Sequence, residues 1–399
     1  MTTSQRIAGH RFLHSPGPTR VPDEVMDAMH RQPMDLADPR VDALIASCES
    51  GLKALLHTTD ADVFMYATNG HGAWEAVIAN LAAPGQTVLV PGTGHFSESW
   101  ALQAEAMGVT VVRTPWREGW PLDMAAIEDA LAADTGHEIV AVFTVHTDTA
   151  SSATSDLQAV RQVITAAGHP ALLVVDVVAS LAAAPFNMDA LNANVVLGAS
   201  QKGLMVPPGL GFVAVDARAL QVASRNPAPR YYWDWARRQN PLSYRKFCGT
   251  PPLNLLMGLQ AALGLIVKEG LAQVHARHQM ITRAVHAAVN AWAEGGAVQL
   301  FVKDPAARSV SVTTIEVSAG IDPEALRTLA RERFQVAMAG GLGPLAGRAF
   351  RIGHLGDMNP AMLLGCLGGV EAAMLVQGIS TGSGGVRAAI ASLAAAEPD

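Results

Sequence analysis

The sequence contains few cysteine residues, and they lie far apart. Cys48, Cys248 and Cys366 are odd in number and widely spaced, so they indicate neither a disulfide framework nor a cysteine metal cluster. Basic residues are also in the minority. The chain has 28 Lys and Arg against 35 Asp and Glu, a net charge of −7 and no basic stripe. Proteins that bind nucleic acid usually carry such a stripe, so we expect no nucleic-acid partner.

One uncharged run bears on the question of a membrane span. One stretch, residues 247–267, has no charged residue and is long enough to raise a membrane span. Two prolines near its start and two polar residues within it favour a buried helix at the domain core or a subunit interface. Residues 1–6 lack the apolar core of a signal peptide. We therefore expect a cytoplasmic protein with no membrane partner.

Apolar residues are plentiful, because half of the 399 residues are hydrophobic and only 16% are charged. This length suits one large α/β core with a smaller appended domain. Apolar strand-like tracts lie at 62–67, 87–90, 109–112, 139–144, 172–176 and from 195, with helical patterns at 72–81, 98–107, 124–131 and 157–167. Such alternation predicts an α/β fold, a mainly parallel sheet with helices on both faces. Residues 209–215 follow too closely for a helical crossover and are expected to return antiparallel.

The pattern changes after Arg225. A long loop rich in proline and aromatic residues comes first, and helical segments run from about 251 to 292. From residue 298 short strands alternate with helices, which is typical of a smaller α+β domain. We predict an N-terminal arm at 1–20, a large domain at 21–270 and a small C-terminal domain at 271–399.

Two ionisable residues follow buried strands. Asp176 ends the apolar tract 172–176, and Lys202 follows the tract that begins at Val195. Open α/β sheets place ligands at the carboxyl ends of their strands. An amine and a carboxylate there suit pyridoxal 5'-phosphate (PLP), because the amine forms a Schiff base and the carboxylate keeps the pyridine nitrogen protonated. Taken singly, the lysine could begin a surface loop and the aspartate could cap a helix, but the pair favours the cofactor.

A glycine-containing turn at residues 67–75 follows one strand and opens a helix. Backbone amides and the helix N-terminus at such a turn attract an anion, so a phosphate is expected there. The turn is neither a P-loop nor a dinucleotide fingerprint. His71 within it either is a plain helix-capping or core histidine or touches the cofactor.

Five segments carry motifs that occur in the same order in one enzyme family. They are residues 16–19, 200–205, 207–212, 250–252 and 351–356, within a similarity from about 16 to about 378. Together they resemble the class V aminotransferases, most closely the serine–, aspartate– and alanine–glyoxylate aminotransferase group. The resemblance implies the PLP-dependent aspartate aminotransferase-like fold (fold type I) and a homodimer with its active sites at the subunit interface.

The resemblance also implies a role for each matching residue. Lys202 would be the Schiff-base lysine and proton carrier, and Asp176 the partner of the pyridine nitrogen. Phe96 would stack on the cofactor ring. Arg351 would hold the substrate α-carboxylate with its planar fork, and Arg348 and the backbone near Gly17 are the other candidates. The remaining implied cofactor contacts are Asn69, Gly70, His71, Thr149, Val178, Gln201 and, toward the neighbouring subunit's phosphate, Thr250.

Each of these residues also has a purely structural interpretation. Arg351 could be a surface strand residue and Phe96 an ordinary core residue. Thr149 and Thr250 could be turn or cap hydroxyls.

The sequence departs from the family pattern at three places. The run 146–152 lacks the glycine that usually closes the turn after the acidic residue, and 36–38 stands where relatives often have His-Arg-Ser. Phe247 occupies the place of a phosphate-binding tyrosine. These differences leave the amino donor open. We predict an aminotransferase acting on a small amino acid, with glyoxylate as the expected acceptor. The alternatives are PLP-dependent aldol-type cleavage, β-elimination of a hydroxy or sulfur amino acid, and a binding or scaffold role.

Overall fold

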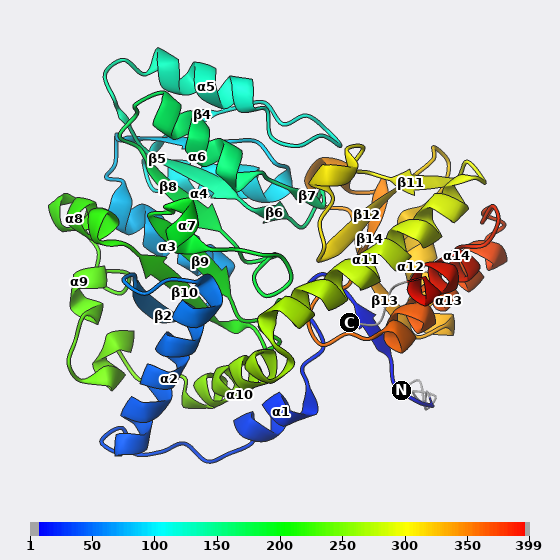
Figure 1. Cartoon of the computed structure of the whole chain (residues 1–399), viewed down its shortest axis with the longest axis horizontal. Coiled ribbons are helices and arrows are strands. Elements are labelled where there is room, and N and C mark those ends of the chain that lie inside the picture. Colours follow the sequence, from blue (N-terminus) through cyan, green and yellow to red (C-terminus); the bar gives the residue numbers. More distant parts are fainter. Residues whose placement is uncertain (1–7, 396–399) are drawn as a thin grey trace, which may run out of the picture.

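The computed structural model describes residues 8–395. Residues 1–6, where no signal peptide is expected, lie outside this range. Two sheets organise the chain, a seven-stranded sheet on the left of Figure 1 and a five-stranded sheet on the right. A two-stranded hairpin, β6 (Thr147–Asp148) and β7 (Ala153–Thr154), is the third sheet of the described residues.

The large sheet has the strand order β2-β10-β9-β8-β5-β3-β4. Its strands are β2 (Asp62–Thr68), β10 (Gly209–Val215), β9 (Val195–Ala199), β8 (Leu172–Asp176), β5 (Ile139–Val145), β3 (Thr87–Val90) and β4 (Thr110–Arg113). Strand β10 runs antiparallel to both of its neighbours, and the other pairs are parallel. The predicted mainly parallel sheet and the antiparallel return of residues 209–215 are both confirmed.

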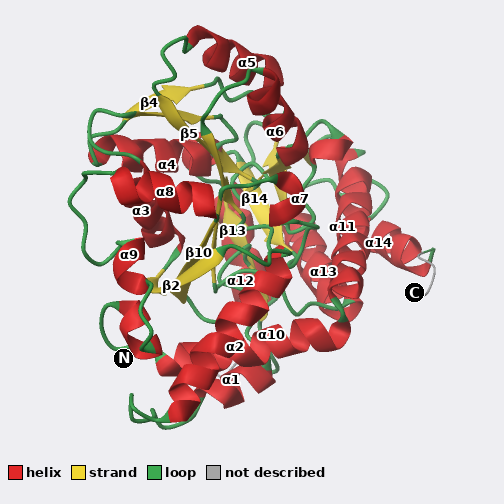
Figure 2. Cartoon of the chain, turned by 60° about the vertical axis from the view of Figure 1, so that its left-hand side comes forward, coloured by secondary structure: helices red, strands yellow, loops and turns green. Residues whose placement is uncertain are grey.

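Alternate side chains of the large sheet enter two separate cores. In β8, Leu173 and Val175 belong to one core, and Leu172 and Val174 to the other. The first core is covered by α1 (Asp23–Met29), α2 (Pro39–Leu56), α5 (Met124–Ala133), α6 (Leu157–Ala166), α7 (Met188–Leu191) and α10 (Leu253–Glu269). The second is covered by α3 (Gly70–Leu81), α4 (His95–Ala106), α8 (Ala217–Arg225) and α9 (Trp235–Arg238). Figure 2 shows helices on both sides of the strands.

Helices α3 and α4 begin two and three residues earlier than predicted, at Gly70 and His95. Asn69 caps α3 with its side chain. At α4 the Ser97 hydroxyl accepts the backbone N–H groups of Thr93 and Gly94. These caps satisfy amides that a helix start otherwise leaves unpaired. As a result, Phe96 lies in the first turn of α4.

The helical region after residue 251 is divided at Gly270, whose φ is 87°. Helix α10 ends there and α11 (Leu271–Ala293) begins, running from the large domain toward the small one in Figure 1. Among residues 8–395, no single helix is long and apolar enough to cross a membrane. Helices α10 and α11 meet that criterion only as a pair, which is bent by 84°.

The small sheet has the order β1-β13-β14-β12-β11. Its strands are β1 (Phe12–His14), β13 (Val336–Gly340), β14 (Ala349–Gly353), β12 (Val312–Val317) and β11 (Val298–Leu300). Its core includes α11, α12 (Pro323–Arg333), α13 (Pro360–Val376) and α14 (Gly385–Ala394). Strand β1 comes from the N-terminal arm and pairs parallel with β13, so the arm completes the small domain.

Candidate active site

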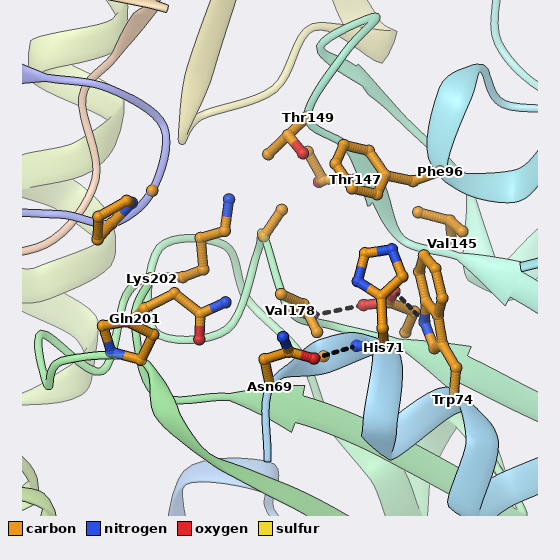
Figure 3. A pocket seen from close by; sticks show the side chains of 16 residues that line it. Asn69, His71, Trp74, Phe96, Val145, Thr147, Thr149, Val178, Gln201 and Lys202 are labelled. Atoms are coloured by element: carbon orange, nitrogen blue, oxygen red, sulfur yellow. Dashed lines mark hydrogen bonds between the residues drawn. The ribbon is translucent and has the colours of Figure 1, made fainter. Parts of the chain in front are cut away.

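A cavity of about 280 Å³ lies where the parallel strands of the large sheet end. Every predicted site residue lines it except Thr250 and Arg351. The predicted residues on its wall are Gly17, Asn69, Gly70, His71, Phe96, Thr149, Asp176, Val178, Gln201 and Lys202. The wall also contains Pro18, Trp74, Val145, Thr147, Ala179 and Pro208, which the sequence did not single out. Figure 3 shows Lys202 facing His71, Trp74 and Phe96 across the cavity.

Asp176 is the last residue of β8 and is 4% exposed. Its Oδ1 accepts the backbone N–H of Val178 at 2.6 Å, and its Oδ2 accepts the indole N–H of Trp74 at 2.8 Å. Burial raises the pKa of the Asp176 carboxyl to about 6, and the two hydrogen bonds oppose that rise. The carboxylate is therefore held in one orientation and stays mostly ionised at pH 7.

Lys202 follows β9 by three residues and reaches the same cavity. Its Nζ donates a hydrogen bond to the Pro16 carbonyl oxygen at 2.5 Å. Burial lowers the pKa of the Lys202 amine to about 8; the charge of Arg351 adds to this, and Asp176 opposes it. The lysine thus carries an amine that is neutral more often than an ordinary lysine at neutral pH.

The N-terminus of α3 forms one end of the cavity. The Asn69 side chain accepts the backbone N–H groups of His71 at 3.1 Å and Gly72 at 3.3 Å. A Cβ at Gly72 would lie 1.8 Å from the Thr68 hydroxyl oxygen, so only glycine allows the helix to start so close to β2. The partial positive charge of a helix N-terminus favours an anion at this end.

Aromatic side chains form the opposite wall from Lys202. The rings of His71 and Trp74 lie 4.6 Å apart, and Phe96 meets Trp74 edge to face at 6.3 Å. These flat apolar groups suit a planar ring in the cavity. Phe96 lines the cavity, and its stacking on a cofactor stays a prediction.

A second buried carboxylate, Asp148 in β6, ties two parts of the wall together. Its Oδ2 accepts the backbone N–H of Phe96 at 2.8 Å and the Thr93 hydroxyl at 3.2 Å. Its Oδ1 accepts the backbone N–H groups of Ala150 and Ser151. Asp148 therefore fixes the start of α4 relative to the turn that carries Thr149.

The turn after Asp148 closes without the glycine that the family resemblance leads us to expect there. Ser152 takes a φ of 58°, in the left-handed region that usually favours glycine. The Ser152 hydroxyl accepts the backbone N–H of Thr314, and the Ser151 hydroxyl donates to the Thr93 carbonyl oxygen. These hydrogen bonds stabilise the turn, although Ser152 lacks the conformational freedom of a glycine.

Arg351 lies on β14, 6% exposed, and does not line the cavity. Its Nε donates to the Gly340 carbonyl oxygen at 2.7 Å, and its Nη1 to that of Thr149 at 2.8 Å. No residue of 8–395 accepts a hydrogen bond from its Nη2. Burial lowers the pKa of Arg351 to about 10, so the guanidinium is charged at neutral pH. Arg351 therefore lies behind Thr149, and its Nη2 group remains available to donate a hydrogen bond.

Thr250 is exposed and lies outside the cavity of its own chain. Phe247, at the position of the expected phosphate-binding tyrosine, is 2% exposed and packs in the core beside α2 and α10. Asp38, in the segment that replaces His-Arg-Ser, caps α2 through the backbone N–H of Arg40. None of these residues contributes to the cavity of the same chain.

Two residues that shape the site were missed from the sequence. Asp148 follows the end of β5 much as Asp176 ends β8, and this position at a strand's carboxyl end is a signal that could have identified it. Trp74 carries no such signal, because a tryptophan on a helix face is usually core. Only the structure distinguishes Trp74 from an ordinary core tryptophan, because its indole N–H lies within hydrogen-bond distance of Asp176.

Comparison with known proteins gives one family. The family model for aminotransferase class-V matches residues 11–344. The chain is 39% identical to a serine–glyoxylate aminotransferase of Methylorubrum extorquens over 392 residues, 96% of both chains. It is 38% identical to an L-aspartate–glyoxylate aminotransferase of Paracoccus denitrificans, with 92% of this chain and 93% of that one covered.

Solved structures agree with the sequence comparisons. The crystal structure of a ureidoglycine–glyoxylate aminotransferase from Bacillus subtilis superposes with a TM-score of 0.87 at 26% identity. The match covers 97% of this chain and 99% of that one.

Proposed function

Because the chain belongs to the class-V aminotransferases, we propose that it moves an amino group from a small amino acid to glyoxylate. The protein is an aminotransferase with the expected aspartate aminotransferase-like fold. The three relatives described above are all named for glyoxylate, and they differ in the amino donor. A donor of the serine, aspartate or alanine type is therefore proposed. The comparisons give no support to the alternative of aldol-type cleavage or β-elimination.

The residues of the cavity fit PLP as the cofactor. Four groups lie around one cavity, and each suits one part of PLP. The amine suits the aldehyde, and the buried carboxylate suits the pyridine nitrogen. The helix N-terminus suits the phosphate, and the aromatic wall suits the flat ring. In addition, the Gln201 Oε1 atom is buried on this wall without a hydrogen-bond partner among residues 8–395. When bound, PLP supplies an aldehyde for amines and a ring that accepts electrons from the substrate α-carbon.

Lys202 and Asp176 are the proposed catalytic residues. Lys202 would hold the cofactor through its amine, and the free amine would take the proton from the donor's α-carbon. Its lowered pKa, about 8, favours this role as a base. Asp176 would keep the ring nitrogen of the cofactor protonated. The presence of the Asp176 carboxyl and the Lys202 amine on the wall of one cavity is the observation that carries the proposal.

The other predicted site residues are proposed to bind the cofactor and the substrate. Asn69, Gly70, His71 and Gln201 would hold the phosphate or the ring, and Phe96, Val178 and Thr149 would contact the ring. Arg351 would bind the substrate carboxylate, with the backbone at Gly17 as the other candidate.

We also propose a homodimer. Thr250 is exposed and lies away from its own cavity, which suits a contact with the phosphate in the neighbouring subunit. The cytoplasmic location expected from the sequence stays a prediction.

A panel of amino donors tests the proposed function. The PLP-loaded protein is incubated with serine, aspartate or alanine and with glyoxylate or pyruvate, and glycine, alanine and the oxo acids are quantified. Glycine formed in equal amount to the donor's oxo acid supports the proposal. Products of cleavage or elimination that form without an oxo-acid acceptor would establish the alternative reaction.

A further inference from the structure

Trp74 makes a direct contact with the proposed ring-nitrogen partner. The residue lies in the second turn of α3, 2% exposed, and its indole N–H donates to Asp176 Oδ2 at 2.8 Å. We propose that Trp74 is a positioning residue, whose N–H keeps the carboxylate of Asp176, the proposed partner of the cofactor's ring nitrogen, oriented and ionised. Because this role acts through a cofactor partner, it rests on the proposed function.

The carboxylate is held at both of its oxygens. Val178 donates its backbone N–H to Oδ1 and Trp74 donates to Oδ2, so rotation about the bond to the carboxyl carbon would break both contacts. An ionised carboxylate accepts more than one hydrogen bond at each oxygen, and acceptor capacity remains for a further donor. Of the two donors, only that of Trp74 comes from a side chain and can be removed by substitution.

The indole itself cannot swing away. Trp74 stacks on Trp100 with centroids 5.5 Å apart and planes 10° apart, and Trp100 stacks on Phe143 at 4.7 Å. His71 covers another side of the indole at 4.6 Å. The stack lies in the core between the large sheet and helices α3 and α4. The direction of the N–H is therefore set by packing before any cofactor binds.

The charge state of Asp176 is the quantity that Trp74 affects. Burial disfavours the carboxylate, and each donated N–H offsets part of that cost. The charged groups that face Asp176 are Lys202, from the turn after β9, and Asp148, from β6, and they act in opposite directions. Two histidines also lie nearby: His146, whose pKa burial lowers to about 4, and His71, whose pKa burial also lowers. Removing the indole N–H leaves all four of these groups in place.

Trp74→Phe and Trp100→Phe form a matched pair. Both keep an aromatic ring in the stack and both remove an indole N–H, but the N–H of Trp100 is buried without a partner among residues 8–395. Since a hydrogen bond to a charged group is lost only in Trp74→Phe, its kcat should fall roughly tenfold or more. The acidic limb of its pH profile should rise by about one pH unit or more. The KM of Trp74→Phe should stay within about twofold of wild type, and so should kcat and KM of Trp100→Phe.

A measurement without turnover accompanies the kinetics. The visible absorption of the bound cofactor is titrated with pH in the absence of substrate, and its acid-side transition should move upward in Trp74→Phe alone. If Trp74→Phe folds poorly, replacing Trp74 with benzothienylalanine retains the size and removes only the N–H. That variant should then show the same shift.

The outcomes separate this role from the proposed function. A wild-type protein that binds no PLP or transfers no amino group refutes the proposed function, and the role of Trp74 with it, before any variant is compared. If the wild type is active and Trp74→Phe matches Trp100→Phe in kcat and titration, Trp74 has no positioning role. Equal losses of kcat in both variants with unmoved pH profiles would assign the effect to the stack and also overturn the proposal.

Discussion

The amine of Lys202 donates a hydrogen bond to the carbonyl oxygen of Pro16, a residue 186 positions away in the sequence. Pro16 belongs to the arm that runs from β1, in the small sheet, to the cavity of the large domain. A Cβ at Gly353, at the end of β14, would lie 2.5 Å from the backbone of Ser15 and Pro16. The arm is therefore packed between the small domain and the proposed catalytic lysine.

Gly17 permits this close approach. Its φ is 140°, and an added Cβ would lie 2.5 Å from Nζ of Lys202. We expect Gly17→Ala to destabilise the protein by about 1–3 kcal/mol through backbone strain and also to weaken PLP binding by displacing the amine. Urea unfolding and PLP titration measure the two effects. Gly168→Ala is the control, because Gly168 has a φ of 60° and no atom within 4 Å of an added Cβ. Normal PLP binding by Gly17→Ala would contradict the proposed steric role.

Lys202→Ala should abolish turnover and the visible absorption band of the lysine-bound cofactor. The fold should survive, because a shorter side chain in an open cavity creates no clash. Absorption spectra and circular dichroism check both statements. The wild type should be coloured, since the lysine-bound cofactor is conjugated. A wild type that stays colourless with added PLP would remove the basis for the cofactor proposal.

Asp176→Asn should retain the covalent link to Lys202 but lose most of the rate, roughly 100-fold or more. The amide is neutral and cannot hold a proton on the ring nitrogen by charge. It also presents an NH₂ group to one of the two donors, Val178 N–H and Trp74 N–H, that now face carboxylate oxygens. The absorption spectrum reports whether the cofactor is still linked to Lys202, and steady-state kinetics measure the loss of rate. Wild-type activity in Asp176→Asn would show that another group serves the nitrogen.

Arg351→Ala should reduce kcat/KM for donor and acceptor alike, because both substrates carry a carboxylate. Loss of the paired donors costs on the order of 2–5 kcal/mol where the pair is desolvated. PLP content should change little, and Arg351→Lys should rescue poorly since a point charge lacks the planar fork.

Arg348→Ala is the matched control for Arg351. Arg348 is exposed and pairs with Glu118 and Glu316 instead of facing the cavity. If Arg351→Ala keeps full activity toward both substrates, the carboxylate is held elsewhere, with the backbone at Gly17 as the next candidate.

Acid should weaken the folded state through buried histidines. Burial lowers the pKa of His14 and of His278 to about 4, below the ordinary value of 6.5. Because the folded state keeps these groups neutral, their contribution to stability is complete above pH 6.5 and is lost as the pH falls toward 4. At pH 5 the free energy of unfolding should be lower than at neutral pH by on the order of 2 kcal/mol for each of these histidines.

His278→Gln provides the test of this acid sensitivity. His278 donates from Nδ1 to the Val274 carbonyl oxygen and accepts the backbone N–H of Gly356 at Nε2. Glutamine also carries a donor and an acceptor group, and it does not titrate. Free energies of unfolding from urea titrations at pH 7 and pH 5 should differ less in the variant than in the wild type. An equal difference in both proteins would assign the acid sensitivity to other groups.

Much of the large domain could be predicted because its signals are local. The apolar runs that became β8 and β9 are buried on both faces, so composition alone marks them as central strands. The short connection before β10 excluded a helical crossover, which made its antiparallel course predictable. Asp176 and Lys202 follow from the same reasoning, because the ends of parallel strands share one edge of the sheet.

Other features depend on partners distant in the chain. Strand β1 has three residues and pairs with β13, more than 300 positions away, and nothing in so short a segment specifies its partner. The position of Arg351, on β14 of the small sheet, behind Thr149 of the large domain depends on how the two domains pack.

The sequence by itself therefore determined the α/β class, the family and the proposed catalytic pair, since periodic burial and residue type at strand ends are local properties. Only the tertiary structure decided that Trp74 donates to Asp176 while Trp100, one layer away, donates to nothing among residues 8–395. The two tryptophans have the same chemistry and similar burial. What differs is which polar atom lies within hydrogen-bond reach, and that is set by the packing of helices α3 and α4 against the sheet.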